Sequence, residues 1–364
     1  MKINGISLSS FRNYRQREFE FAEGVNVITG KNATGKTNLL EAIGMMCGIG
    51  SFRGAKRADL INWEEQAAFL SCSAFSRLRD FKLELTINRA APSVAKINGV
   101  KKTASEFSDV LKCVVFCPED LFIVSSAPAL RRDFLDRCIK NLHPSYHTLL
   151  QKYSKLMAGK AKILKNLDEN PSMGDILPEY DGALIECCVR MAHLRHRLVK
   201  ALSPLAAEAQ KEISGGRDEL FIEYSCPKEL KSFDDLPLLR EEMRANFDRL
   251  KNAEMASRSC LAGVHKDDVA IFVNGRNARL FASQGQTRTA SLALKLSERE
   301  LYRRDCGEYP LLLLDDVFSE LDKSRREYIM ESAGKGQVII TSCTRVDEIP
   351  ASAKVLSPSC DDYM

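Results

Sequence analysis

The fold is decided by the stretch Val25-Asn26-Val27-Ile28-Thr29-Gly30-Lys31-Asn32-Ala33-Thr34-Gly35-Lys36-Thr37. An apolar, β-branched run leads into the pattern Gly-x-x-x-x-Gly-Lys-Thr, and residues 38–46 continue with the spacing of a helix. This order of strand, glycine-pinned loop and helix is the one that a phosphate-binding loop (P-loop) requires. A chance match in a surface turn is the alternative, and the flanking strand and helix argue against it. The stretch therefore indicates a nucleotide-binding site.

Each residue type in this loop has a physical role in holding a nucleotide. Gly30 and Gly35 let the backbone curl so that successive N–H groups point at phosphate oxygens. The positive end of the following helix favours the same anion. Lys36 is expected to reach the β- and γ-phosphates of ATP, and the Thr37 hydroxyl is expected to hold Mg²⁺. The complete predicted loop consists of Gly30, Lys31, Asn32, Ala33, Thr34, Gly35, Lys36 and Thr37.

A second motif lies far along the chain and ends in two acidic residues: Tyr309-Pro-Leu-Leu-Leu-Leu-Asp315-Asp316. A buried strand that ends in aspartate is the Walker B arrangement of P-loop ATPases. Asp315 is expected to orient Mg²⁺. Asp316 is expected to polarise the attacking water, and with Lys36 it forms the predicted catalytic set. The alternative is a buried strand with an acidic turn. Ser319 is predicted to cap the next helix, and residues 337–342 are predicted to form the last strand of the sheet.

A third motif, Ser283-Gln284-Gly285-Gln286, stands directly before a helical run at residues 290–304. Serine and glycine at this point make a second anion-binding helix N-terminus. A single triphosphate does not need two such sites within one chain. We therefore expect Ser283, Gly285 and Gln286 of one protomer to contact the γ-phosphate held by the P-loop of another. Ordinary helix capping without a ligand is the alternative.

Length and composition set the broad class. The chain has 364 residues, which suits one large domain or two lobes, with 45% hydrophobic and 28% charged residues and a formal net charge of +4. No apolar run approaches the roughly 20 residues of a membrane span, so no membrane association is expected. The twelve cysteines are scattered from Cys47 to Cys360 without a Cys-x-x-Cys pair. We therefore expect reduced cysteines in a cytoplasmic protein, with no zinc site.

The hydrophobic periodicity changes along the chain. Alternating strands and an Asn98-Gly99 hairpin signal predict a β meander at residues 67–101, whereas residues 130–214 have helical periodicity. A Pro- and Gly-containing break at 170–178 divides this region into two helices, and Pro204 is expected to kink or interrupt the second. We predict three segments: residues 1–125 as the first part of an ATPase head, 126–260 as a helical insertion lobe, and 261–364 as the rest of the head.

Basic residues concentrate in the helical region. Residues 131–166 contain nine Lys or Arg against two Asp, and residues 190–200 add four basic residues and two histidines without an acid. A polyanion-binding surface and a set of solvated helix faces are both consistent with this pattern. The sequence also leaves two possible roles open for each of two loops. Phe11-Arg12-Asn13-Tyr14 is either a nucleotide-proximal loop or a plain strand connection, and residues 51–57 are either a phosphate-contacting loop or a surface turn.

Taken together, these motifs resemble the ABC-type ATPase heads of the SMC superfamily, and within it the RecF family of bacterial recombination-repair proteins. The likeness spans essentially the whole chain. Its further elements are Leu8-Ser-Ser-Phe11-Arg12-Asn13-Tyr14, Pro118-Glu119-Asp120-Leu121, Val264-His265-Lys266-Asp267-Asp268 and Ser283-Gln-Gly-Gln-Thr-Arg288-Thr. Lys31, Thr34 and Lys266 depart from the family's more usual residues. ABC transporters have a histidine after the last strand. Thr341-Ser342-Cys343-Thr344 lacks it, as the family tends to, so hydrolysis is expected to be slow.

The resemblance implies an α/β, ABC-type P-loop ATPase head with a meandering β portion and an inserted helical lobe. It implies ATP and Mg²⁺ as ligands, a homodimer that forms with ATP, and binding to duplex or gapped DNA without sequence specificity. RecR, and functionally RecO and RecA, are the implied protein partners, with RecA loading as the outcome. The basic helices and the Arg53–Arg57 loop are candidates for contacts with DNA phosphates. Two alternatives stay open: an ATP-binding DNA scaffold that needs no turnover, and the nucleotide-binding subunit of a transporter.

Overall fold

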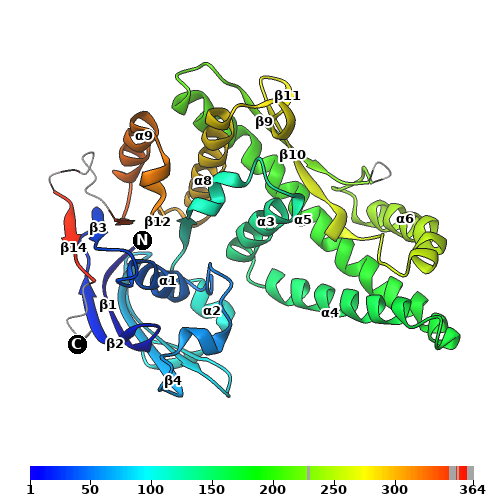
Figure 1. The fold of residues 1–364 in the computed structure, drawn as a ribbon, viewed down its shortest axis with the longest axis horizontal. Helices are drawn as coiled ribbons and strands as arrows, with labels where there is room; N and C mark the ends of the chain where they lie inside the picture. The colour runs from blue at the N-terminus through cyan, green and yellow to red at the C-terminus, as the bar shows by residue number, and fades with distance from the viewer. Residues whose placement is uncertain (228–229, 344–349, 351, 359–364) are drawn as a thin grey trace. The chain divides into compact units, whose positions relative to one another are not determined.

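The structure is a computed structural model that describes residues 1–227, 230–343, 350 and 352–358 (Figure 1). It divides into two compact units. Unit 1 consists of residues Met1–Phe122, Glu208–Arg217 and Thr287–Met364, and unit 2 consists of Ile123–Ala207 and Asp218–Gln286. These units are groups of contacting residues. The domain boundaries predicted at residues 125 and 260 stay predictions.

A five-stranded parallel sheet forms the centre of unit 1. Its strand order is β14-β3-β13-β12-β8. The strands are β3 (Val25–Thr29), β8 (Cys113–Phe116), β12 (Leu311–Asp315), β13 (Val338–Ser342) and β14 (Lys354–Leu356). Every residue of β12 and β13 is buried, as expected for strands covered on both faces. The predicted P-loop strand and Walker B strand are confirmed, and β13 lies between them.

A six-stranded antiparallel sheet is the second layer of unit 1, in the order β2-β1-β4-β5-β6-β7. The strands are β1 (Lys2–Phe11), β2 (Tyr14–Glu20), β4 (Ala67–Ser76), β5 (Arg79–Asn88), β6 (Val94–Ile97) and β7 (Val100–Lys102). Asn98 and Gly99 join β6 to β7 with φ of 51° and 79°, the left-handed pair that a tight hairpin turn needs. The predicted meander is confirmed.

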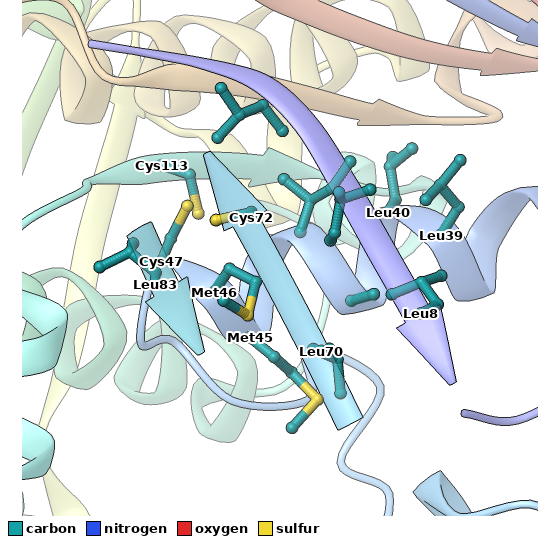
Figure 2. Packing of buried hydrophobic residues seen from close by; sticks show 14 of the residues in the cluster. Leu8, Leu39, Leu40, Met45, Met46, Cys47, Leu70, Cys72, Leu83 and Cys113 are labelled. Atoms are coloured by element: carbon teal, nitrogen blue, oxygen red, sulfur yellow. The ribbon is translucent and has the colours of Figure 1, made fainter. Parts of the chain in front are cut away.

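Helix α1 (Lys36–Met46) contacts strands of both sheets, and its apolar side chains fill the core between them. Figure 2 shows Leu39, Leu40, Met45 and Met46 beside Leu8, Leu70 and Leu83 from the antiparallel sheet. Cys47, Cys72 and Cys113 gather at one end of this cluster. The hydrogen bond with Cys113 and burial raise the pKa of Cys47 well above its ordinary value, and burial raises that of Cys72 to about 12. All eleven cysteines in the described part of the chain are free thiols.

The remaining elements of unit 1 are helices and short 3₁₀ turns. They are η1 (Arg57–Leu60), α2 (Ala104–Ser108), η2 (Pro118–Phe122), most of α8 (Gln284–Cys306), η5 (Val317–Glu320) and α9 (Lys323–Ala333). The prediction that Ser319 caps the next helix is wrong. Ser319 lies within η5, and α9 begins after Asp322, whose carboxylate accepts a 3.0 Å hydrogen bond from the Arg325 N–H.

Unit 2 is built mainly from helices. They are α3 (Pro128–Leu142), α4 (Tyr146–Lys165), η3 (Pro171–Ile176), α5 (Leu177–Ile213, whose last six residues belong to unit 1), α6 (Leu236–Ser257), η4 (Val264–Lys266) and α7 (Ala278–Phe281). A small antiparallel sheet of β9 (Leu220–Ser225), β10 (Asp268–Val273) and β11 (Arg276–Asn277) completes it.

Two predictions about the helices of unit 2 have different outcomes. The break at 170–178 is confirmed, because η3 separates α4 from α5. Pro204 was expected to kink or interrupt the second helix; the interruption is wrong, because α5 continues through it. Pro204 and Lys200, whose carbonyl group loses its backbone hydrogen bond, are both exposed, so that carbonyl group is accessible to solvent. Within the described residues, the structure contains no helix with both the length and the apolar character of a membrane span.

Candidate functional site

The P-loop joins the carboxyl end of β3 to the first turn of α1. Gly35 is the N-cap of α1 with φ of 99°, a conformation that favours glycine. A Cβ atom there would come within 2.7 Å of Asn13 Nδ2 and 2.8 Å of Tyr14 Oη. The first turn of α1 carries no acidic side chain, so the partial positive charge of the helix N-terminus is available to an anion.

Lys36 is the first residue of α1, and its side chain lies back across the loop. Its Nζ donates hydrogen bonds of 2.8 Å to Gly30 O and 2.9 Å to Lys31 O, and the residue is 5% exposed. Thr34 also stabilises the loop, because its hydroxyl donates to Lys31 O at 2.9 Å. The ammonium group is therefore held directly beside the loop that would cradle phosphates.

The acidic end of β12 meets the P-loop helix. The Thr37 hydroxyl donates a 2.9 Å hydrogen bond to Asp315 Oδ1, and the Thr341 hydroxyl donates to the same oxygen at 2.8 Å. Burial raises the pKa of Asp315, and the hydrogen bonds from Thr341 and Thr37 oppose that shift. The sheet order produces this meeting, because Asp315 pairs with Thr341 and Ser342 pairs with Thr29 at neighbouring strand ends.

The oxygen donors Thr37 Oγ1 and Asp315 Oδ1 suit Mg²⁺, which binds one or two protein oxygens and completes its shell with water and phosphate. The described residues contain no group of three or more His, Cys, Asp or Glu that would form an all-protein metal cage. Thr37 and Asp315 would hold the ion. Bound there, the ion would neutralise charge on the β- and γ-phosphates.

Asp316 follows β12 in the left-handed conformation, with φ of 49°. Its N–H donates to Thr341 Oγ1 at 2.9 Å, which fixes the backbone turn. Cys343 lies directly after β13. Its Sγ is 2.6 Å from Asn32 Oδ1 of the P-loop and 3.4 Å from each Asp316 carboxylate oxygen. The structure thus brings Asp316 beside the P-loop. Thr344 lies outside the described residues.

The turn between β1 and β2 supports the P-loop helix. Arg12 Nε and Nη2 each donate a 2.9 Å hydrogen bond to the fully buried Glu41 carboxylate of α1. Asn38 Nδ2 donates to Asn13 Oδ1 at 2.7 Å, and the Tyr14 hydroxyl donates to Gly35 O at 3.0 Å. Of the two alternatives for this turn, the structure supports the nucleotide-proximal loop.

The loop at residues 51–57 is joined to the same helix. Ser51 Oγ donates to Glu41 at 2.5 Å, and Arg53 Nη1 donates to Asn38 Oδ1 at 3.2 Å. Sequence reasoning missed Glu41 and Asn38 as support residues. A carboxylate in the middle of the apolar run Leu39–Met46 was the available signal, because a buried acid needs a cationic partner.

Ser283 and Gln286 form a reciprocal cap at the start of α8. Ser283 Oγ accepts from the Gln286 N–H at 3.2 Å, and Gln286 Oε1 accepts from the Ser283 N–H at 3.0 Å. Gln286 Nε2 also donates to Asp218 Oδ1 at 2.9 Å. Ser283, Gly285 and Gln286 belong to unit 2, whereas the P-loop and Asp315 belong to unit 1. Their action on the nucleotide of another protomer stays a prediction.

The Val264–Asp268 stretch forms part of the interior of unit 2. Arg131 Nε and Nη2 donate to Asp268 at 2.7 and 2.9 Å, while Tyr224 Oη donates to Asp267. Arg195 Nη1 donates to Val264 O at 2.8 Å. Burial raises the pKa of Asp267 to about 6. These contacts show a structural role for the stretch within unit 2.

Three residues counted in the basic segments are therefore not part of a charged surface. Arg131 is buried against Asp268, Arg195 is buried against Asp136, and Lys160 is buried against Asp181 and Glu254. Each is 3% exposed or less. The basic surface is smaller than the sequence suggests.

The parallel sheet, the P-loop and the acidic end of β12 together define a mixed α/β ATPase head of the kind found in SMC proteins. An Smc head bound to the C-winged helix domain of ScpA has the same fold, with a TM-score of 0.55 and 15% identity. The family described as RecF/RecN/SMC N terminal domain matches residues 2–353.

Two relatives and two solved structures place the chain more narrowly. The DNA replication and repair protein RecF of Desulforamulus reducens is 35% identical, covering 94% of this chain and 92% of the relative. That of Bacillus cereus (strain G9842) is 36% identical over 96% of this chain and 93% of the relative. Structures described as the recombination mediator protein RecF with ATPrS and with ATP have TM-scores of 0.91 and 0.86, each 33% identical over 98% of this chain and 96% of theirs. The chain belongs to the RecF family of DNA replication and repair proteins.

Proposed function

We propose that the protein is an ATP-dependent DNA-binding protein of recombinational repair and replication restart, acting in the cytoplasm. It dimerises around ATP on duplex or gapped DNA and, with RecR and RecO, helps to load RecA. Hydrolysis is slow, is stimulated by DNA, and resets the dimer. The γ-phosphate is suited to this switch because it supplies contacts that differ between the closed and open states.

The observation that carries the proposal is the meeting of Thr37, Asp315 and Thr341 beneath the P-loop. Lys36 and the helix N-terminus supply the positive field for the phosphates. Asp316, whose carboxylate contacts the same Cys343 Sγ as the P-loop residue Asn32, is the candidate general base. The likeness to a RecF structure described with ATP supports the same ligand. Lys36 and Asp316 are therefore the proposed catalytic residues, and Thr37 and Asp315 are the proposed Mg²⁺ ligands.

The proposed dimer is tested by light scattering with Mg-ATP, with and without duplex DNA. Wild-type protein is expected to dimerise only with ATP. Lys36→Ala, which loses the phosphate-binding ammonium, and Ser283→Arg, which fills the helix N-terminus with a cation, are expected to stay monomeric. Ser172→Arg adds the same charge at another exposed site of unit 2 and is expected to behave as wild type. A wild type that stays monomeric with ATP and DNA present would overturn the composite site.

A second candidate function is an ATP-binding DNA scaffold that needs no turnover. Cys343 favours the scaffold, because it directly follows β13, where ABC transporters have a histidine. Lys36→Arg is expected to bind ATP and hydrolyse it poorly. If this variant restores DNA-damage survival to cells lacking the protein, the scaffold is favoured, and if it fails, the switch is favoured.

A further inference from the structure

Helix α4 has an unusual charge composition. Its twenty residues, Tyr146–Lys165, include five lysines and no Asp or Glu. Lys160 is buried and bridges Asp181 and Glu254. The other four lysines are exposed, and we call them the lysine face: Lys152, Lys155, Lys162 and Lys165.

The lysine face points away from the packed side of α4. Tyr153, Ile163 and Leu164 are buried on that packed side. At about 100° per residue, Lys155 and Lys162 project almost opposite to them, and the other two lysines flank this pair. At about 1.5 Å per residue, the four lysines extend over about 20 Å of helix. Together they form a band that winds through about 140° around the helix.

None of these four lysines has an ion pair within the part of the chain that the structure describes. Asp168, which follows the helix, is paired with Arg258 instead. Lysines three residues apart repel each other by a few tenths of a kcal/mol, and helices normally offset this with acids one turn away. The helix C-terminus favours Lys162 and Lys165, but Lys152 and Lys155 lie too far from it to benefit. The repulsion is therefore left uncompensated for the first pair.

We propose that the lysine face binds the phosphate backbone of DNA, an inference that rests on the proposed function and assigns its contact surface. A band of exposed lysines supplies point charges to phosphates without reading base sequence. The other exposed residues of α4 are His147, Thr148, Gln151, Ser154 and Ala158. They lack the large apolar and aromatic side chains that anchor protein partners, so the chemistry of this face fits DNA better than an acidic protein.

The test measures the affinity for a labelled DNA duplex by fluorescence anisotropy in Mg-ATP over a series of salt concentrations. The variant changes Lys152, Lys155, Lys162 and Lys165 to Gln. If each lysine contacts one phosphate, the slope of log affinity against log salt falls by about 3.6, or about 0.9 per contact. Affinity is expected to fall by about tenfold or more at moderate salt. Changing the same four residues to Arg keeps the charge and is expected to preserve both quantities.

A matched control changes four other exposed lysines, Lys96, Lys101, Lys211 and Lys335, to Gln. It alters the net charge equally and is expected to leave the slope near the wild-type value. Thermal melting of every variant checks that unit 2 stays folded. An unchanged slope in the α4 variant, or an equal loss in the control, would overturn the assignment of this face. Wild-type protein that shows no DNA binding even at low salt would instead overturn the proposed function.

Discussion

At Gly35 the backbone turns with φ of 99°, and the adjacent space is filled by Asn13 and Tyr14. We expect Gly35→Ala to weaken ATP binding by at least tenfold and to destabilise the protein by about 1–3 kcal/mol, because the Cβ atom clashes and the conformation is strained. Fluorescent-nucleotide titration and thermal melting measure the two effects. Gly24→Ala is the control, since nothing lies within 4 Å of its Cβ position. Equal behaviour of the two variants would contradict the close approach at Gly35.

Arg12 and Glu41 provide a second test at the scale of single residues. Glu41 is fully buried on α1, and Arg12→Ala leaves its charge without a cationic partner. We expect a loss of about 3 kcal/mol or more in the free energy of unfolding, measured by chemical denaturation. Arg15→Ala removes an ion pair with Glu64 in which both side chains are 76% exposed, and about 0.5 kcal/mol is expected. An Arg12→Ala protein as stable as Arg15→Ala would show that Glu41 is not held by this pair.

Most P-loop residues were predictable from sequence because their roles follow from local backbone geometry and side-chain chemistry. Thr37 and Asp315 were predicted separately as metal ligands. In the structure, Thr37 Oγ1 lies 2.9 Å from Asp315 Oδ1. The support given by Arg12, Asn13 and Tyr14 was left open, since contacts between a turn and a distant helix have no local signal. Cys343 was named only as part of a stretch without histidine. Its contact with Asn32 and Asp316 depends on the strand order.

At the scale of elements, Asp322 and Ser319 can be compared as caps of α9. Asp322→Ala removes the side chain that accepts from the Arg325 N–H, so we expect a loss of about 1 kcal/mol in stability. Ser319→Ala is expected to cost less than about 0.5 kcal/mol, because Ser319 is exposed and caps no α-helix. Denaturant titration of both variants checks the difference. A larger loss of stability for Ser319→Ala than for Asp322→Ala would support the helix start at Ser319 that was expected from the sequence.

Strands and helices with strong periodicity were predicted well, and element ends were not. The capping error at Ser319 arose because Ser-Glu-Leu-Asp offers two capping side chains, and the chain uses the later one. Pro204 was expected to kink or interrupt α5, but the helix continues through this exposed position. The basic segments were overestimated as surface because sequence spacing does not show which charges meet acids from other elements.

At the scale of the whole molecule, the composite site predicts complementation between two defective proteins. Lys36→Ala keeps Ser283, and Ser283→Arg keeps the P-loop, so a mixed dimer contains one intact site. We expect each variant alone to have almost no ATPase activity and the mixture to regain part of the wild-type rate. Steady-state phosphate release at a fixed total protein concentration measures this. No recovery on mixing, with both proteins folded, would argue that each chain completes its own site.

The parallel sheet has a consequence for how the protein is made. Strand β3 comes from the first thirty residues, yet its neighbours β13 and β14 come from residues 338–342 and 354–356. Gln337 also bonds the Ile3 backbone, with both hydrogen bonds at 2.8 Å. The P-loop strand therefore pairs with β13 and β14 only after residues 338–356 have left the ribosome. During synthesis this apolar strand stays exposed and without these two neighbours. A truncated or stalled chain therefore carries an aggregation-prone segment and lacks a complete nucleotide pocket.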